Sequence, residues 1–417
     1  MEIRRDIYLN KLINRMHNGM IKVVTGIRRS GKSYLLFTIF KDYLLSEGVD
    51  EDHIISIELD RLENKTYRDP YVILEQIKTQ IIDSKDYYIF LDEVQLLDEF
   101  EDVLNSLLHI KNVDVYVTGS NSKFLSKDII TEFRGRGDEV HVYPVSFREY
   151  MTVFNGDKYE GWSSYVRFGG LPLTVTMNSD EQRVEYLTRL FEETYIKDII
   201  ERNHIEKKQE LNDLINVLAS GIGSLTNPSK IVATFNSVIQ SDISLNTVRS
   251  YIEHLEDAFI ISEANRYDVK GRKYIGTPLK YYFEDVGLRN ARLGFRQVEE
   301  THLMENIIYN ELRVRGFSVD VGVVMKRNRT EAGVQEKKQL EIDFIANQGS
   351  RRYYIQSAFS IPDEEKREQE KASLINVGDS FKKIIIVKDV VKPWHDDDGI
   401  LTISLYDFLL DEKSLEL

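Results

Sequence analysis

Eight consecutive residues near the start of the chain have the spacing of a phosphate-binding loop. The pattern G-x-x-x-x-G-K-[ST] is matched by Gly26, Ile27, Arg28, Arg29, Ser30, Gly31, Lys32 and Ser33, with Tyr34 directly after it. Because glycine has no Cβ, the backbone N–H groups of such a loop can curl around a phosphate. Lys32 would place a positive charge against the β- and γ-phosphate oxygens, and the hydroxyl of Ser33 is a ligand for Mg²⁺. We therefore predict that residues 26–34 bind the phosphates of a nucleotide together with Mg²⁺.

The segments on either side of this loop favour the same interpretation. Residues 21–25 have the pattern of a buried strand, and residues 34–40 that of the helix whose N-terminus holds the anion. The alternative is a chance match with no role in phosphate binding. A chance match does not require a strand before the loop and a helix after it.

Two carboxylates follow a second apolar segment. Residues 87–91 form a continuous apolar run, and Asp92 and Glu93 come directly after it. An acid at the end of such a strand can hold Mg²⁺ through water, and the next acid can polarise the water that attacks the γ-phosphate. We assign these roles to Asp92 and Glu93. The alternative is a solvated Asp-Glu pair where the strand leaves the sheet.

A polar segment, Thr118-Gly119-Ser120-Asn121, follows the strand expected at residues 113–118. A polar side chain at this place could sense the γ-phosphate or position the attacking water, so Asn121 is a further candidate catalytic residue. Taken alone, the segment is equally well a turn.

The elements that must hold these residues alternate along the first part of the chain. Strands are expected at residues 21–25, 53–59, 87–93, 113–118 and 141–144, and helices at 34–40, 70–82 and 100–110. Strands that alternate with helices imply a parallel sheet covered on both faces, with its ligands at the carboxyl ends of the strands. The predicted fold class is α/β, with a P-loop parallel sheet.

The composition narrows the class of protein. At 417 residues the chain is too long for a single core, so several domains are expected. It has no cysteine, which excludes disulfides, thiolate metal sites and cysteine-based catalysis. No apolar run is long enough to span a membrane, and we expect a soluble, cytoplasmic protein. The net charge of -14 argues against nucleic acid covering the whole surface but leaves room for a local basic patch.

Further segments, spread over nearly the whole chain, carry a resemblance. They are residues 25–33, 91–95, 118–121, 144–150, 169–172, 198–202 and 281–290. With these segments the chain resembles a prokaryotic family of AAA-type ATPases that carry a C-terminal domain with a restriction-endonuclease-like fold. The resemblance implies ATP as the nucleotide, a module that forms homo-oligomers, and a protein partner that the sequence does not identify.

A Gly-Arg pair within residues 133–137 recurs in this family. The resemblance makes Arg136 the better candidate for an arginine finger, a residue that acts on the nucleotide of a neighbouring subunit. The alternative is that Arg134 and Arg136 decorate a loop or pair with Asp138 and Glu139.

The resemblance and the changes of pattern divide the chain into four parts. They are an AAA-type ATPase core (residues 1–151), a helical lid (152–206), a winged-helix-like domain (207–290) and a restriction-endonuclease-like domain (291–417). In the third part, helices and two strands around a basic loop at 270–273 indicate a winged helix, in which Asn246, Thr247 and Arg249 would face DNA. The acidic residues Glu253, Glu256 and Asp257 on the same helix instead favour a packing role.

The last part has the strand order of a nuclease core but not its full set of catalytic residues. Asp343 fills the position of one acid, and Glu305 or Glu311 could supply another from a helix. On the next strand, however, Gln356 and Ala358 occupy the positions of the second acid and the lysine that such nucleases use. We therefore expect the fold without the nuclease activity.

Two classes of function remain. The first is an Mg²⁺-dependent ATPase whose cycle moves the winged-helix and C-terminal parts on DNA or another partner. The second is a nucleotide-loaded interaction switch with little turnover. The intact Glu93 favours the enzyme, and Gln356 and Ala358 disfavour a third reading, an ATP-regulated nuclease.

Overall fold

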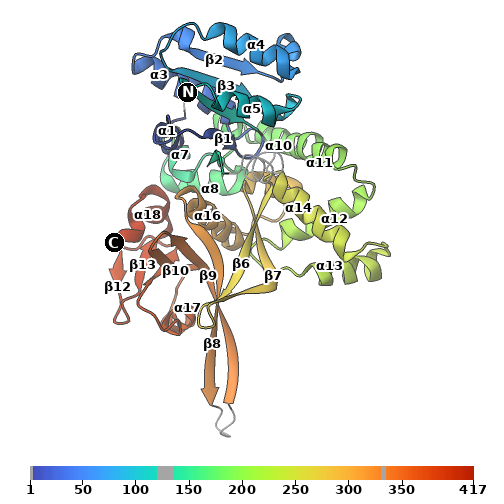
Figure 1. Cartoon of the computed structure of the whole chain (residues 1–417). Coiled ribbons are helices and arrows are strands. Elements are labelled where there is room, and N and C mark those ends of the chain that lie inside the picture. Colours follow the sequence, from blue (N-terminus) through green and yellow to red (C-terminus); the bar gives the residue numbers. More distant parts are fainter. Residues whose placement is uncertain (1–2, 120–134, 330–334) are drawn as a thin grey trace. The chain divides into compact units, whose positions relative to one another are not determined.

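The computed structural model describes residues 3–119, 135–329 and 335–417, and the chain forms two compact units (Figure 1). Unit 1 comprises Met1–Val145, Leu171–Leu173 and Glu256–Ile260, and unit 2 comprises Ser146–Gly170, Thr174–Leu255 and Ile261–Leu417. Over the described ranges, every helix is too short or too polar to cross a lipid bilayer.

Unit 1 is built on a five-stranded sheet in the order β2-β3-β4-β1-β5. Its strands are β1 (Ile21–Thr25), β2 (Ile54–Glu58), β3 (Tyr87–Asp92), β4 (Val113–Thr118) and β5 (Gly137–His141). Every pairing in it is parallel, which confirms the predicted α/β class. The last strand was predicted at residues 141–144 and instead occupies Gly137–His141. β5 lacks the apolar pattern of a buried strand because it lies at the edge of the sheet, where polar residues are tolerated. Its residues Asp138 and Glu139 bond to Arg15 and Thr25.

Helices cover both faces of this sheet. They are α1 (Asp6–Ile13), α2 (Lys32–Tyr34), η1 (Leu35–Phe40), α3 (Lys41–Ser46), α4 (Pro70–Gln80) and α5 (Phe100–Leu108), with short 3₁₀ turns η2 (Glu51–His53), η3 (Leu62–Arg68) and η4 (Val94–Leu96). Side chains of α4 and α5, such as Ile77 and Leu104, share one core with Ile89 and Leu91 of β3. On the other face, Phe40 packs on Phe90 and Tyr116, with ring centroids 5.7 and 4.9 Å away. The sheet is thus fixed from both sides.

Unit 2 contains a mixed eight-stranded sheet in the order β12-β13-β11-β10-β9-β8-β6-β7. The strands are β6 (Ile261–Asp268), β7 (Lys273–Phe283), β8 (Ser318–Arg329), β9 (Gln335–Gln348), β10 (Arg351–Ala358), β11 (Lys382–Val387), β12 (Trp394–His395) and β13 (Leu401–Ser404). The β6–β7 hairpin, expected as the wing of a separate domain, belongs to this sheet because β6 pairs in parallel with β8. The boundary predicted after residue 290 therefore falls inside unit 2. Local sequence indicates a hairpin but not the distant strand that it joins.

The helices of unit 2 precede the sheet, connect its strands or follow it. They are α7 (Phe147–Met151), α8 (Lys158–Phe168), α9 (Pro172–Thr176), α10 (Asp180–Arg189), η6 (Leu190–Ile196), α11 (Lys197–Arg202), α12 (Lys208–Ser220), α13 (Pro228–Thr234), η7 (Phe235–Ile239), α14 (Leu245–Asp257), α15 (Val286–Arg292), α16 (Glu300–Val314), α17 (Glu364–Ile375), α18 (Leu405–Leu410) and η8 (Ser414–Glu416). Two of them pack on the central strands. Leu374 of α17 joins the core of Ile342 and Tyr354, and Tyr309 of α16 stacks on Tyr282.

Two segments that carry the family resemblance meet inside unit 2. The side chain of Asp285 caps α15 by accepting from the N–H of Leu288 at 2.9 Å, and it also accepts from the N–H of Gly170 at 2.7 Å. A Cβ at Gly169, whose φ is +70°, would lie 2.3 Å from an Asp285 oxygen, so only glycine fits there. Burial raises the pKa of Asp285 to about 6. These motif residues therefore have an architectural role.

Replacing this carboxylate should destabilise the protein. We expect Asp285→Ala to lower the free energy of unfolding by about 3 kcal/mol, because it removes a helix cap and leaves the buried N–H of Gly170 without its acceptor. The matched control is Asp363→Ala, which removes the exposed cap of α17 and should cost much less. Urea unfolding followed by circular dichroism measures both, and equal losses would show that the tether to Gly170 contributes nothing.

Candidate nucleotide site

The predicted phosphate loop leaves β1 and enters the continuous helix that begins at Lys32. Gly26 has φ +137°, and a Cβ there would lie 2.2 Å from the carbonyl oxygen of Val142. Gly31, at φ +96°, directly precedes α2. Both glycines are thus required by the backbone path, and the loop ends at a helix N-terminus, where N–H groups and the helix dipole favour an anion.

Within the loop, cationic and hydroxyl groups lie where a phosphate would need them. The Nζ of Lys32 donates to the carbonyls of Gly26 at 2.9 Å and Ile27 at 3.1 Å, so the ammonium folds over the loop. The hydroxyl of Ser30 is buried and has no hydrogen-bond partner among the described residues. A buried hydroxyl without a partner is costly, and an anion in the loop would relieve that cost. Of the other predicted loop residues, Ile27 is buried, whereas Arg28, Arg29 and Tyr34 are exposed.

A buried carboxylate joins this loop to the two central strands. Asp92, the last residue of β3, accepts from the hydroxyl of Ser33 at 3.0 Å and from the hydroxyl of Thr118 at the end of β4. The Thr118 oxygen in turn accepts from the N–H of Glu93 at 3.0 Å. Burial raises the pKa of Asp92, and the hydrogen bonds from Thr118 and Ser33 only partly oppose it. The predicted magnesium residues Ser33 and Asp92 are thus in direct contact.

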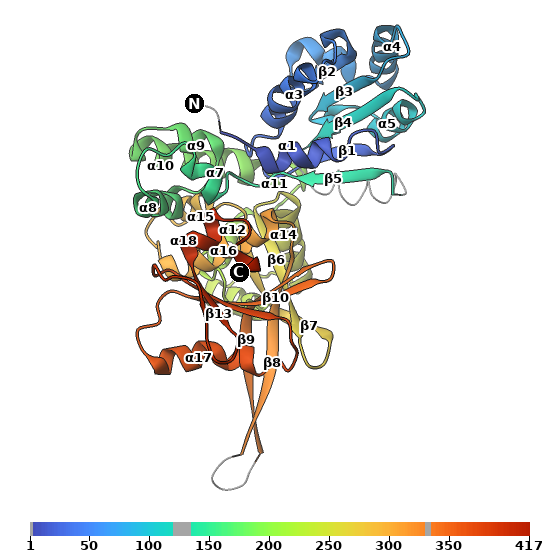
Figure 2. The ribbon, with the colours of Figure 1, turned by 90° about the vertical axis from the view of Figure 1, so that its left-hand side faces the viewer.

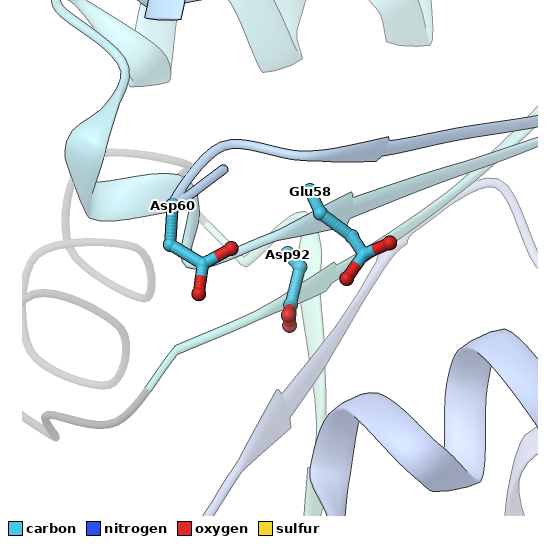
Figure 3. Close-up of side chains that lie close together, drawn as sticks. All are labelled: Glu58, Asp60 and Asp92. Carbon is cyan, nitrogen blue, oxygen red and sulfur yellow. The ribbon is translucent and has the colours of Figure 1, made fainter. Parts of the chain in front are cut away.

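Two further acids meet Asp92, and the sequence analysis missed them. One ligand oxygen each of Glu58, Asp60 and Asp92 lie within 4.8 Å of one another. Figure 3 shows these side chains converging at the ends of β2 and β3, where Glu58 pairs in register with Asp92. Carboxylate and hydroxyl oxygens are the ligands that Mg²⁺ prefers, so this edge of the sheet fits the cation. The sequence carries a signal for Glu58, because this acid ends β2, the strand next to β3.

Glu93 lies at the turn directly after β3. Its φ of +51° is unusual for a residue with a side chain, and its N–H is held by Thr118. One oxygen of its half-buried carboxylate accepts from the side-chain amide of Gln95. The structure therefore fixes the backbone of Glu93 beside Asp92 and gives its carboxylate a second contact on the same turn.

The remaining two predicted catalytic residues lie elsewhere or outside the described ranges. Asn121 is outside them, as is Arg134. Arg136 is exposed, and its carbonyl accepts from the N–H of Ile21, which places it at the amino end of β1 and β5. The phosphate loop follows the carboxyl end of β1, roughly 16 Å away along the strand. The pairing considered for Arg136 is not present, since Asp138 bonds to Arg15 at 2.8 Å and Glu139 to Thr25 at 2.5 Å.

The acids suggested for a nuclease site in unit 2 surround an internal cation. The Nζ of Lys280 on β7 lies 2.9 Å from Glu305, 2.8 Å from Glu341 and 3.9 Å from Asp343. Burial and the Glu305 carboxylate raise the pKa of Asp343 to about 8. Burial alone would lower the pKa of Lys280, but the surrounding carboxylates outweigh it and raise that pKa.

This cluster adds a cation and an acid that strand 353–358 does not supply. Lys280 comes from a distant strand, and Glu341 lies on the same face of β9 as Asp343. Glu311, the other helix acid considered, lies apart and pairs with Arg315 at 2.7 Å.

Comparisons with known proteins agree with a nucleotide-binding N-terminal part. Residues 18–151 match a family described as "AAA domain", and residues 159–299 match a "Domain of unknown function (DUF8612)". An uncharacterized protein of Haemophilus influenzae is 33% identical over 414 residues, which is 98% of each chain. An uncharacterized protein of Methanocaldococcus jannaschii is 27% identical over 390 residues, 89% of this chain and 80% of that one. The Orc1 protein of Aeropyrum pernix, solved in complex with DNA, is 13% identical with a TM-score of 0.29, covering 70% of this chain and 92% of its own.

The contact between Thr118 and Asp92 gives a test of the site. Thr118→Val keeps the shape but removes the hydroxyl, so the pKa of Asp92 should rise further and its affinity for a cation should fall. We expect the Mg²⁺ concentration for half-maximal MgATP binding to increase about tenfold, as for the loss of one charge-assisted hydrogen bond. Calorimetric titration measures this, with Thr402→Val, a buried strand threonine of unit 2, as the control. An unchanged Mg²⁺ requirement would mean that Thr118 has no influence on Asp92.

Proposed function

The chain belongs to the family of the uncharacterized Haemophilus influenzae protein and carries an AAA domain over residues 18–151, and from this we propose that it binds MgATP and hydrolyses it to ADP and phosphate. The observation that carries the proposal is the 3.0 Å hydrogen bond between the Ser33 hydroxyl and Asp92. It joins a loop suited to phosphates with a strand end suited to a cation. A chance loop match or a solvated acidic pair would not require the two to meet.

The loop residues would act on the phosphates. In the nucleotide-bound state, the ammonium of Lys32 would exchange the carbonyls of Gly26 and Ile27 for β- and γ-phosphate oxygens, where it offsets the charge that develops in the transition state. The N–H groups at the start of α2 and the hydroxyl of Ser30 would donate to the same oxygens. The N–H groups and the Ser30 hydroxyl already lie in the loop, so among these groups only the ammonium of Lys32 has to change its partners on binding.

The strand ends would supply the cation site and the base. Ser33 and Asp92 would hold Mg²⁺, with Glu58 and Asp60 adding negative charge nearby; when bound, Mg²⁺ neutralises the phosphate oxygens and favours departure of ADP. Glu93 would orient the attacking water and accept its proton, leaving Asp92 and Thr118 to fix the backbone at that turn. The proton then passes to solvent as phosphate leaves.

Arg136 is proposed to act in a homo-oligomer rather than in its own subunit. It lies at the amino edge of the sheet, roughly 16 Å along β1 from its own phosphate loop, and this distance is too long for an arginine side chain. Its exposure and the engagement of Asp138 and Glu139 with other residues leave it available to a neighbouring subunit.

One contact favours the second candidate function, an ATP-loaded interaction switch with little turnover. The side-chain amide of Gln95 donates to the carboxylate of Glu93, so the proposed base is partly occupied in this state. A partner that drew Gln95 away would then start hydrolysis. Nuclease activity is not proposed, because Glu305 and Glu341, which would have to hold a metal ion, already share the ammonium of Lys280.

The exchange of one acid for its amide separates binding from hydrolysis. Glu93→Gln should bind MgATP as tightly as the unaltered protein and hydrolyse it at least ~10²-fold more slowly, because the proton acceptor is lost. Calorimetry and steady-state phosphate release measure the two properties. Lys32→Ala, which lacks the phosphate-binding cation, is the control expected to lose binding itself. If Glu93→Gln hydrolysed ATP at nearly the rate of the unaltered protein, Glu93 would not be the base. If the unaltered protein, without a partner, hydrolysed almost no ATP, the interaction switch would be favoured over the enzyme.

Mixed assemblies test the role of Arg136. Arg136→Ala should bind MgATP normally but turn it over ~10³-fold more slowly, as expected when an arginine finger is lost. Mixing it with Lys32→Ala should restore part of the hydrolysis, because the second protein supplies Arg136 to an intact phosphate loop in the first. No rescue on mixing, together with a specific rate that is independent of protein concentration, would contradict action between subunits.

A further inference from the structure

The β8–β9 hairpin of unit 2 extends well beyond the sheet that holds it. β6 pairs with β8 only as far as Val323, and β10 pairs with β9 only from Phe344 onward. Six cross-strand pairs, from Val324 opposite Leu340 to Arg329 opposite Gln335, continue as two strands alone. We call these residues, 324–329 and 335–340, the β8–β9 ribbon. At about 3.4 Å per residue it is roughly 20 Å long, and both views show it projecting from the sheet (Figures 1 and 2).

Two lysines lie directly opposite each other in this ribbon. They are Lys326 on β8 and Lys338 on β9. Like charges placed directly opposite destabilise a β-ladder, so this arrangement opposes folding unless a counter-charge is supplied. Lys338 is exposed, Lys326 is half-buried, and neither forms an ion pair with any described residue. Residues 326–338 contain five basic and two acidic side chains in a chain whose net charge is -14.

A second basic segment lies at the base of the ribbon. The β6–β7 turn carries Lys270 and Arg272, and Lys273, which pairs in register with Asp268, begins β7 directly after it. All three basic side chains are exposed, and none forms an ion pair with a described residue. The N–H of Val269 donates to the carbonyl of Val323 at 3.1 Å, so this turn begins directly beside the strand that becomes the ribbon. The turn and the ribbon therefore form one basic surface built from two hairpins.

The need to protect exposed strand edges from aggregation does not explain why the charges of the ribbon and the turn are positive. A charge of either sign prevents edge-to-edge aggregation. Acidic residues outnumber basic ones in the chain, 69 to 55. The turn nevertheless carries Lys270 and Arg272, and the directly opposed charges Lys326 and Lys338 are both positive. The charge pattern therefore indicates a polyanionic partner.

The shape of the surface indicates which polyanion. A two-stranded β-ribbon fits the major groove of B-DNA, which is about 12 Å wide, whereas the major groove of duplex RNA is too narrow to admit one. A membrane surface is less suited, since the ribbon residues described as exposed, Lys338 and Gln339, are polar and offer no apolar side chain to the lipid interface. We propose that the β8–β9 ribbon binds duplex DNA in its major groove while Lys270, Arg272 and Lys273 contact the adjacent phosphates.

This surface differs from the DNA contact that the sequence suggested on α14. It uses none of Asn246, Thr247 or Arg249, and it lies entirely within unit 2. DNA binding at this surface does not require ATP hydrolysis, because its charges and backbone pairing are remote in sequence from the phosphate loop.

The test measures binding of a short fluorescein-labelled DNA duplex by anisotropy at several salt concentrations. Charge reversal of both lysines, Lys326→Glu with Lys338→Glu, keeps a like-charge pair in the ladder, so the stability of the ribbon should change little. We expect the affinity for DNA to fall at least ~10-fold. The slope of log K against log salt concentration should become less steep, by about the amount that corresponds to two lost phosphate contacts. The control reverses two exposed lysines elsewhere in unit 2, Lys392→Glu with Lys413→Glu, which changes the net charge equally and should reduce affinity much less. ATP turnover should be unchanged in both.

A single exchange separates binding from a structural role. Lys338→Glu places a carboxylate opposite Lys326, which should leave the melting temperature the same or higher while DNA affinity falls. Equal loss of affinity in the ribbon and control proteins would overturn the proposal, as would binding of duplex RNA equal to that of DNA. Ribbon-dependent binding to vesicles of phosphatidylcholine and phosphatidylserine without binding to DNA would assign the surface to a membrane instead.

Discussion

Asp92 joins the loop at residues 26–33 to the sheet through its hydrogen bond with Ser33, and the candidate site depends on the cost of keeping the charge of Asp92 buried. Its side chain is almost inaccessible, and burial raises its pKa. The hydroxyls of Ser33 and Thr118 reduce that cost without removing it, since neither carries a positive charge. Glu58 and Asp60 approach the same place and increase the local negative charge. A site with this balance gains stability from a divalent cation, and Ser33 links that gain to the loop that would hold the phosphates.

Several acidic side chains of unit 2 are stabilised in another way, by groups that belong to the fold. Asp285 is satisfied by backbone N–H groups at the start of α15 and in the Gly169–Gly170 segment. Glu305 and Glu341, which are partly buried, share the ammonium of Lys280, and the hydroxyl of Tyr282 also donates to Glu305. In both cases the partners belong to the fold itself. The contrast separates a carboxylate that stabilises architecture from one, such as Asp92, whose surroundings leave room for a cation.

Much of unit 1 could be predicted from the sequence because its signals are local. The glycines of the loop are required by its backbone angles, and the run that ends in Asp92 is apolar because β3 is buried on both faces. Glu58 and Asp60 were missed because their importance depends on β2 lying next to β3, which is a matter of strand order. β5 was misplaced because an edge strand tolerates polar residues that hide its pattern.

Unit 2 was harder to predict because its decisive contacts join residues far apart in the chain. The β6–β7 hairpin was recognised as a hairpin, but its membership of the eight-stranded sheet depends on the pairing of Arg266 with Val321. Lys280 was not connected with Asp343 for the same reason, since 63 positions separate them in the sequence. The Gly169–Gly170 segment was recognised by family resemblance, and only the contact with Asp285 explains why these residues occur together. A recurring motif therefore need not mark a catalytic role.

The polarity of the five-stranded sheet constrains how the proposed enzyme could work. In a parallel sheet all carboxyl ends lie at one edge and all amino ends at the other, so the phosphate loop, Asp92 and Glu58 come together without long connections. The same polarity sends Arg136 to the far edge, since it precedes β5 while the loop follows β1. A subunit with this polarity would present the proposed nucleotide site at one edge and the exposed Arg136 at the other. If two copies met through these opposite edges, Arg136 of one copy would reach the proposed nucleotide site of the other. This geometry is the physical reason to expect that hydrolysis depends on assembly.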